Sequence, residues 1–234
     1  TTLNKQNNYI IIFADGNSSD STLNFIKNIK PEKNVSIHLI CNYEHFVYRQ
    51  SNSIFLYSQK FNYDFGFLVN DDIIFVKEDW DNNYYGIAMK TKFHHLVFFD
   101  KSHKNIQHEE KTNLLISNCD AFNCQGAFFT FTKKLINDVG YFDEENFKIR
   151  GHSHIDFTIR CCKKGYNNLK KLYDIVFSEK FIKLNNKNYV SSYTKLPLFI
   201  RELYKVDLFE LERRMNILKD NDRIYVESKF KIIE

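Results

Sequence analysis

The sequence is poor in the residues that interrupt regular structure. Among its 234 residues are only seven glycines and two prolines, and there is no low-complexity run. Flexible linkers and disordered segments are rich in such residues and runs, so their scarcity argues against both. Hydrophobic residues make up 43% and aromatic residues 16% of the chain, which is enough for a packed core. We therefore expect a single folded domain over residues 1–234.

The chain also lacks long apolar stretches and cysteine motifs. No apolar stretch approaches the roughly 18 residues of a membrane span, and no signal-peptide core opens the sequence. The five cysteines form no CxxC motif and no zinc-ligand spacing; they are Cys41, Cys119, Cys124, Cys161 and Cys162. An odd number of cysteines without a secretion signal predicts reduced thiols and a cytoplasmic location.

A strong charge of either sign is missing as well. The formal net charge is +4, and short lysine clusters at residues 133–134, 163–164 and 170–171 are spread along the chain. This is too weak to predict nucleic acid as the main partner. A basic face could still rest peripherally on an anionic membrane or hold phosphates.

One stretch, YDFGFLVNDDIIF at residues 63–75, combines an apolar run with an acidic pair. The run predicts a buried strand, and Asp71 and Asp72 follow directly after Asn70 at its end. In open α/β sheets, ligands bind outside the carboxyl ends of the strands. Adjacent carboxylates there suit Mg²⁺ or Mn²⁺ carrying substrate phosphates, although a solvated turn after a strand is the simpler alternative.

The apolar pattern predicts that strands and helices alternate throughout the chain. The apolar pattern predicts strands at 8–14, 35–40 and 63–69, a helix from Ser21 that Pro31 closes, and a second helix over residues 44–60. This alternation predicts an α/β fold whose sheet is mostly parallel. Further on, we expect a strand pair within residues 84–99, Trp80 in the core, and a long amphipathic helix over 196–218 that packs on the sheet or acts as a lid.

Four blocks of sequence resemble family 2 glycosyltransferases, in the family's order and spacing. IIIFADGNSSDST at residues 10–22 is similar to the family's VVDDGSTDGT: Asp15 and Ser18 match, and Gly16 replaces the second aspartate. Residues 70–72 fall on the metal-binding DxD position, where Asn70 replaces the first carboxylate. This pair of blocks places the acidic stretch in a known type of site.

The other two blocks lie in the second half of the chain. CQGAFFTFTKKLINDVGYFDEENF at 124–147 resembles the family's GAFFAIRREVLEEVGGFDE, and GHSHIDFTIRCCKKGY at 151–166 resembles GEDVEFSLRLRKAGY. In the last block Ser153 and His154 replace an acidic pair, while Asp156 matches a later carboxylate. The matches cover residues 9–180 and leave 190–234 as a helical C-terminal extension.

The resemblance implies a GT-A fold, a Rossmann-like mixed and mostly parallel sheet flanked by helices. It implies a nucleotide-sugar donor, UDP-sugar by preference, and Mn²⁺ or Mg²⁺ as cofactor. Asp72 would hold the metal and Asp71 the ribose or donor sugar. The remaining residues expected to bind the donor are Asp15, Asn17, Gly126 and Ala127. Asp15 would reach the nucleoside, and Gly126 would let the backbone approach the sugar closely.

A general base must also take the proton of the acceptor hydroxyl, and two residues compete for this role. Asp156 is a carboxylate in the matched block, but it could instead complete a capping box with Ser153 or pair with Arg160 one turn later. His154 occupies the family's usual position for the base, and a neutral imidazole can accept a proton near pH 7. His154 could also be a metal ligand.

The resemblance implies a metal-dependent, inverting glycosyltransferase that builds a polysaccharide, glycolipid or glycoprotein glycan. A sugar nucleotidyltransferase shares the α/β layout, but this sequence lacks the Gly-rich phosphate loop that such an enzyme needs. A catalytically degenerate relative that only binds glycan or nucleotide is the other alternative, because Gly16, Asn70 and His154 depart from the family pattern. Family members also begin with a strand and helix before the Asp15 loop, so we expect about 30 further residues before Thr1 or another segment in that place.

Overall fold

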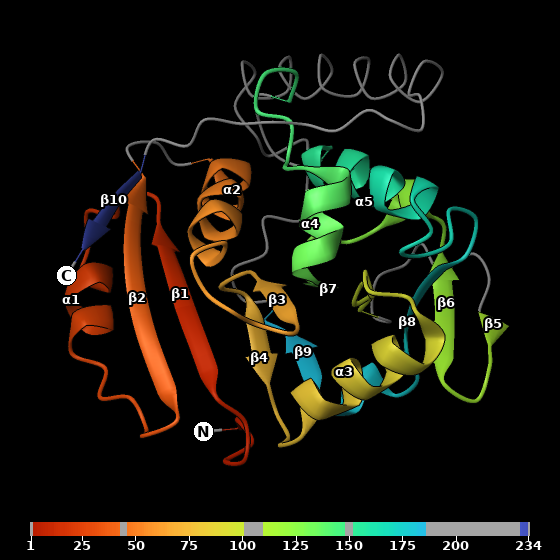
Figure 1. Cartoon of the computed structure of the whole chain (residues 1–234), viewed down its shortest axis with the longest axis horizontal. Helices are drawn as coiled ribbons and strands as arrows, with labels where there is room; N and C mark the ends of the chain where they lie inside the picture. Colours follow the sequence, from red (N-terminus) through yellow and green to blue (C-terminus); the bar gives the residue numbers. More distant parts are fainter. Residues whose placement is uncertain (1, 43–45, 101–109, 148–151, 186–229, 234) are drawn as a thin grey trace.

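The structure is a computed structural model and describes residues 2–42, 46–100, 110–147, 152–185 and 230–233 (Figure 1). The strands are β1 (Tyr9–Asp15), β2 (Val35–Asn42), β3 (Gly66–Val69), β4 (Ile73–Phe75), β5 (Glu110–Lys111), β6 (Leu115–Cys119), β7 (Phe128–Phe131), β8 (Leu172–Ile175), β9 (Ile182–Leu184) and β10 (Phe230–Ile233). The helices are α1 (Thr22–Lys27), α2 (Val47–Ser58), α3 (Trp80–Thr91), α4 (Lys133–Val139) and α5 (Ser153–Lys163), with short 3₁₀ turns η1 (Ala121–Asn123) and η2 (Ser178–Lys180).

The first sheet has the order β1-β2-β10 (Figure 1). β1 runs parallel to β2, with Tyr9 opposite Val35 and Asp15 opposite Cys41, so Asp15 lies at the carboxyl end of its strand as the sequence predicts. β10 joins the far side of β2 in the antiparallel direction. Residues 230–233 are therefore a strand, whereas the sequence predicts a helical extension there.

Backbone hydrogen bonds join most of the remaining strands into a second group. β3 pairs with β7, β8 pairs with β6, and β6 pairs with β5. Residues 96–98 lie between β7 and β8: the Phe98 amide donates to Phe128 O over 3.1 Å and the Val97 amide donates to Tyr173 O over 3.2 Å. The hydrogen-bonded order is therefore β3, β7, 96–98, β8, β6, β5, and β4 pairs separately with β9.

The expectation of a mostly parallel sheet is wrong for the described residues. There β1 and β2 form a parallel pair, and the other five pairs of named strands are antiparallel. Parallel neighbours need a crossover connection, usually a helix, whereas antiparallel neighbours do not. The strand–helix alternation that predicts parallel pairing holds only for the first part of the chain. The fold is mixed α/β.

Strand β7 is the centre of the packing because both of its faces are covered. Phe128 is fully buried in one cluster with Trp80 and Tyr84 of α3. Phe129 and Phe131 belong to a second cluster, which includes residues of α2, α4 and α5. Such double coverage explains why all four residues of β7 are buried, including the polar Thr130.

Residues 84–90 are helical, and the strand predicted there is wrong. Trp80, Tyr84 and Ala88 recur at every fourth position and are all buried on one face of α3. The aromatic residues favour a strand by propensity, but the four-residue spacing lets a helix bury them against β7, and packing decides. Trp80 is in the core as predicted, with its ring 4.0 Å from that of Phe75.

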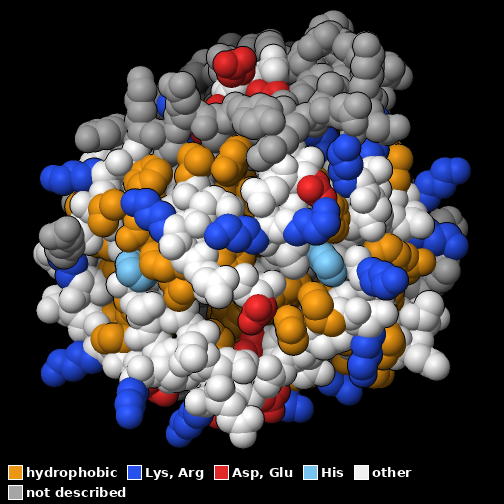
Figure 2. Space-filling view, in the orientation of Figure 1, with side chains coloured by type: hydrophobic (Ala, Val, Ile, Leu, Met, Phe, Trp, Pro, Cys, Tyr) orange, Lys and Arg blue, Asp and Glu red, His pale blue; other side chains and the backbone are white. Residues whose placement is uncertain are grey.

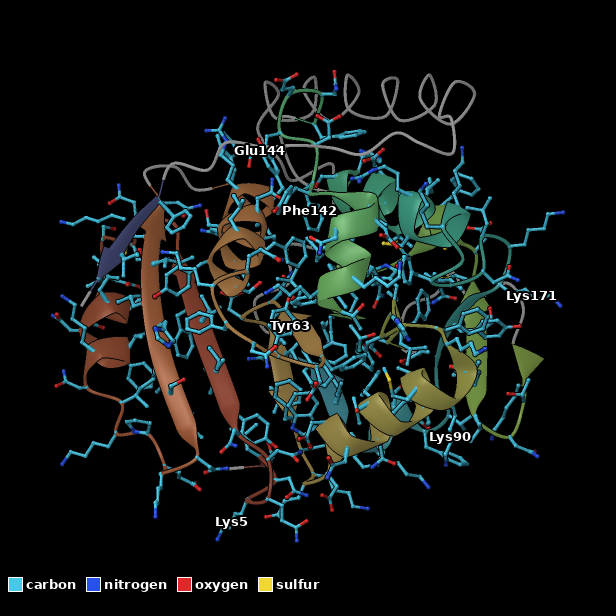
Figure 3. All side chains as sticks on the ribbon, viewed as in Figure 1. Lys5, Tyr63, Lys90, Phe142, Glu144 and Lys171 are labelled. Atoms are coloured by element: carbon cyan, nitrogen blue, oxygen red, sulfur yellow. The ribbon has the colours of Figure 1, made fainter. Side chains whose placement is uncertain are left out.

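Both ends of α4 follow the sequence signals closely. Thr132 is the N-cap of α4 and its hydroxyl accepts from the Leu135 amide over 3.1 Å. Gly140 ends that helix with a φ of 84°, a left-handed value that favours glycine. The loop after α4 is held to α2, because Asn52 accepts from the Phe142 amide and donates to Glu144 (Figure 3).

Some expectations fall on residues outside the described part of the chain or stay predictions. The amphipathic helix predicted over 196–218 lies outside the described residues. Among the described strands, β1 is hydrogen-bonded along one edge, to β2. The expected strand beside its other edge stays a prediction. In the described part, no helix is both long and apolar enough to cross a membrane. Figure 2 shows Lys and Arg side chains spread over the visible face rather than gathered in one patch.

Candidate functional site

The acidic pair lies in the turn between β3 and β4, and backbone hydrogen bonds hold this turn from two sides. The Asn70 amide donates to Ala127 O, just before β7, over 2.9 Å. The Asn185 amide, just after β9, donates to Asp72 O over 2.6 Å. The turn is therefore fixed between the ends of two other strands, as a site that must hold charged groups in place requires.

The two carboxylates of this turn have different surroundings. Asp71 is exposed, whereas Asp72 is half-buried. Burial, and to a smaller extent the charge of Asp71, raises the pKa of Asp72 above its ordinary value. Asp72 Oδ1 is buried and has no hydrogen-bond partner within the described part of the chain. A buried carboxylate oxygen without a partner is costly unless a cation or a donor from a ligand binds it.

This arrangement fits a divalent cation that takes few ligands from the protein. In the described residues there is no group of three or more His, Cys, Asp or Glu side chains that could hold a metal. Mg²⁺ commonly binds one or two carboxylates and completes its shell with substrate phosphates and water. Asp72, with Asp71 beside it, offers that kind of partial site.

The loop before β7 brings the predicted donor-binding residues to this turn. Ala127 bonds Asn70 as described, and Gly126 precedes it. His154, at the start of α5, packs against Gly126 from the other side: a Cβ atom on Gly126 would lie 2.7 Å from His154 Cγ. His154 Nε2 lies 3.1 Å from Cys124 O. The structure therefore brings three parts together. They are the turn with Asp71 and Asp72 (the acidic turn), the loop at residues 124–127 that carries Gly126 (the glycine loop), and His154.

His154 is neutral at physiological pH. Burial lowers its pKa to about 4, although the bond to the Cys124 carbonyl opposes this shift. A carbonyl oxygen can only accept, so the Nε2–H of the neutral ring donates to it. This nitrogen is therefore occupied by the protein itself.

Asp156 is fully buried and forms an ion pair within its own helix. Its Oδ2 accepts from Arg160 Nε over 3.0 Å. The predicted pairing with Arg160 is thus confirmed. The predicted capping box is not formed, because α5 begins at Ser153 and its N-cap is His152, whose side chain makes no cap bond. The box fails because the helix starts one residue earlier than it requires: Ser153 would have to be the N-cap, but it is already the first helical residue.

The turn after β1 stands apart from the other candidates. Asp15 is buried and its Oδ2 accepts from the Ser18 amide over 2.9 Å, and Asn17 adopts a left-handed φ of 66°. In the described residues, no hydrogen bond or ion pair joins Asp15 or Asn17 to the acidic turn. Their donor-binding role stays a prediction.

Strand β8 carries a buried carboxyl that none of the sequence motifs includes. Asp174 on β8 is fully buried and accepts from the Tyr84 hydroxyl over 2.8 Å. Burial raises its pKa to about 7. The signal that could have revealed it is an aspartate in the middle of the apolar run LYDIVF, because an acidic residue in a buried strand must be paired or protonated.

Comparison with known proteins finds similarity to part of a viral protein. The chain is 31% identical over 133 residues to a protein named as an uncharacterized glycosyltransferase from Acanthamoeba polyphaga mimivirus. The match covers 56% of this chain and 50% of that protein, so the chain spans about half the length of the curated relative it matches. No protein-family profile matches the chain. No solved structure matches it either.

Proposed function

We propose that the chain is a metal-dependent glycosyltransferase of the family 2 kind, with a GT-A fold. It would move a hexosyl or N-acetylhexosaminyl group from a nucleotide sugar, most simply a UDP-sugar, to a hydroxyl of a glycan, lipid-linked or protein acceptor, with inversion. The observation that carries the proposal is the buried, unpartnered Oδ1 of Asp72 in a turn that contacts the glycine loop. The name of the viral relative supports the reaction class.

In this proposal Asp72 holds Mn²⁺ or Mg²⁺, with the donor diphosphate and water as the remaining ligands. The bound cation would offset the negative charge that grows on the leaving diphosphate. Without the cation, burial raises the pKa of Asp72. A bound cation would favour the charged carboxylate and so lower this pKa again.

The other residues of the site would bind and orient the donor. Asp71 is exposed and can accept from ribose or sugar hydroxyls. Gly126 and Ala127 are small residues, so their backbone would be able to approach the sugar closely. Asp15 and Asn17 would contact the nucleoside from the end of β1. Holding the donor in one orientation lowers the entropic part of the barrier.

We assign no general base. The Asp156 carboxylate is enclosed and bonded to Arg160, and His154 Nε2 is bonded to Cys124 O. In the described conformation, each of these two hydrogen bonds joins the candidate residue to another part of the protein. The geometry favours the ion pair with Arg160 for Asp156, and the variants described below test both residues.

The test uses the full chain with a panel of nucleotide sugars and Mn²⁺, and measures donor hydrolysis and transfer. We expect Asp72→Asn to reduce metal-dependent turnover by ~10²-fold or more, as for the loss of one charge-stabilising group. Its thermal stability should be unchanged or higher, because a buried unpaired carboxylate is removed. Asp64→Asn, an exposed aspartate shortly before β3, is the control and should behave as wild type.

Near wild-type Mn²⁺-dependent turnover in Asp72→Asn would refute the assignment of the metal. Wild-type protein that binds Mn²⁺ and UDP but turns over no donor would instead favour a degenerate binding module. Release of pyrophosphate from a nucleoside triphosphate and a sugar phosphate would favour a sugar nucleotidyltransferase.

A further inference from the structure

His154 leaves no room for a side chain on the loop that enters β7. A Cβ atom on Gly126 would lie 2.7 Å from His154 Cγ and 3.0 Å from its Cβ and Cδ2. Contacts this short between heavy atoms do not persist, so the loop or the ring would have to move if Gly126 carried a methyl group. The imidazole thus sets how far the loop can approach α5.

The same ring also holds the loop by a hydrogen bond. His154 Nε2 donates to Cys124 O over 3.1 Å, two residues before Gly126. Packing against one residue and a bond to another fix the loop in both distance and direction. Burial keeps the ring neutral, with a pKa of about 4, so the charge of the ring does not change over the physiological range.

The loop passes this constraint on to the acidic turn. The carbonyl of Ala127, the residue after Gly126, accepts from the Asn70 amide over 2.9 Å. Asn70 is directly followed by Asp71 and Asp72. A shift of the loop would therefore shift the turn that carries both carboxylates.

We propose that His154 is a positioning residue, which fixes the 124–127 loop and, through Asn70, the placement of Asp71 and Asp72 for the metal-bound donor. The proposal rests on the function proposed above. It gives His154 a role that needs neither proton transfer nor contact with the metal.

Two substitutions at His154 separate the ring's contacts from its acid–base chemistry. The Gln side chain of His154→Gln can still donate to Cys124 O but does not titrate, so we expect kcat/KM for the UDP-sugar with Mn²⁺ to stay within ~3-fold of wild type. His154→Ala removes both contacts and should lower kcat/KM by ~10²-fold, the loss expected for a misplacement of about 1 Å. It should also weaken Mn²⁺ binding measured by titration.

A double-mutant cycle tests the contact with Gly126. Gly126→Ala alone should lower activity, because its methyl group meets the imidazole. Gly126→Ala combined with His154→Ala should be more active than Gly126→Ala alone, because the shortest contact is removed. Gly86→Ala on α3 is the control: a Cβ there meets no atom within 4 Å, so the same added methyl should have no effect.

Three results would overturn the inference. One is a His154→Gln variant as inactive as His154→Ala, which would assign a proton-transfer role. The second is strict additivity of the Gly126 and His154 changes in both turnover and melting temperature. The third is unaltered Mn²⁺ affinity in His154→Ala. Wild-type protein without Mn²⁺ binding or turnover would refute the proposed function itself. In that case the double-mutant cycle, measured by melting temperature, would test only the packing contact between Gly126 and His154.

Discussion

Among the described residues, two carboxyl groups have a raised pKa, and their surroundings give them different roles. Asp72 is half-buried in a turn, and one of its oxygens has no partner within the described residues. Asp174 is enclosed by the core and bonded to the Tyr84 hydroxyl. A perturbed pKa indicates a functional site only together with access for a ligand. Asp72 meets this condition, and Asp174 acts as a buried structural group.

The buried Asp174 predicts a pH-dependent stability that Asp174→Asn should remove. Its pKa rises from an ordinary 3.8 to about 7, so the folded state holds a proton that the unfolded state releases. The stabilising contribution of the protonated group is complete below about pH 4 and is lost as the pH rises through about 7. We expect urea unfolding to show the variant gaining stability relative to wild type between pH 5 and 8. A constant difference over this range would contradict the prediction.

At the scale of single elements, helix α5 is anchored by one buried arginine. Arg160 donates to the Asp156 carboxylate, to Val139 O and to Tyr141 O. The two carbonyls flank Gly140 at the end of α4, so the arginine joins the end of one helix to the side of the next. With these bonds made, Arg160 is buried at 3% exposure without being left unpaired.

Breaking this buried pair should lower the free energy of unfolding far more than breaking an exposed pair with the same spacing. Asp156→Asn and Arg160→Met should each lower the free energy of unfolding by about 3–5 kcal/mol, because one partner removed leaves the other poorly compensated in the core. Lys134→Met, which breaks the exposed i,i+4 pair with Asp138, should cost about 0.5 kcal/mol or less.

The same variants test the catalytic alternative for Asp156. If it serves as an anchor, the kcat of folded Asp156→Asn, measured well below its melting temperature, should stay close to that of wild type. A fall of ~10²-fold or more in kcat with little loss of stability would instead assign Asp156 as the general base.

At the scale of the whole molecule, the segment before β1 ties the first sheet to the second group of strands. Tyr9 OH and Asn7 Nδ2 both donate to Asp81 Oδ2 in the first turn of α3. Asn4 Nδ2 donates to Asp79 Oδ1, just before that helix, over 2.6 Å. These bonds connect β1 to the helix that packs beside β7.

Removing the Tyr9 hydroxyl should therefore weaken the attachment of the first sheet to α3. Tyr9→Phe should cost about 1–2 kcal/mol of stability, because Asp81 is buried and loses a hydrogen-bond donor. The loss should be non-additive with Asp81→Asn by at least about 0.5 kcal/mol in a double-mutant cycle. Tyr85→Phe, on the exposed side of α3, is the matched control and should change stability by less than about 0.5 kcal/mol.

Much of the local structure was predictable from the sequence alone. The strands at the start of the chain, the Thr132 cap, the Gly140 terminus and the position of Asp71 and Asp72 at a strand end all follow from short-range patterns. These features depend on backbone conformations and hydrogen bonds between residues a few positions apart, which the local sequence specifies. The helix at 80–91 was missed because its aromatic residues favour a strand until β7 is present to cover one face.

The sequence by itself determined the order of the first five elements, from β1 to β3, as well as the acidic turn and the glycine loop. Only the tertiary structure decided that the strands after β2 pair mainly antiparallel, that Asp156 is occupied by Arg160, and that His154 meets Gly126. These outcomes depend on contacts between segments that are distant in the chain or on the burial that such contacts produce. A carboxylate on a solvated helix and one enclosed in a core read identically in sequence, and packing alone separates a reactive group from an anchor.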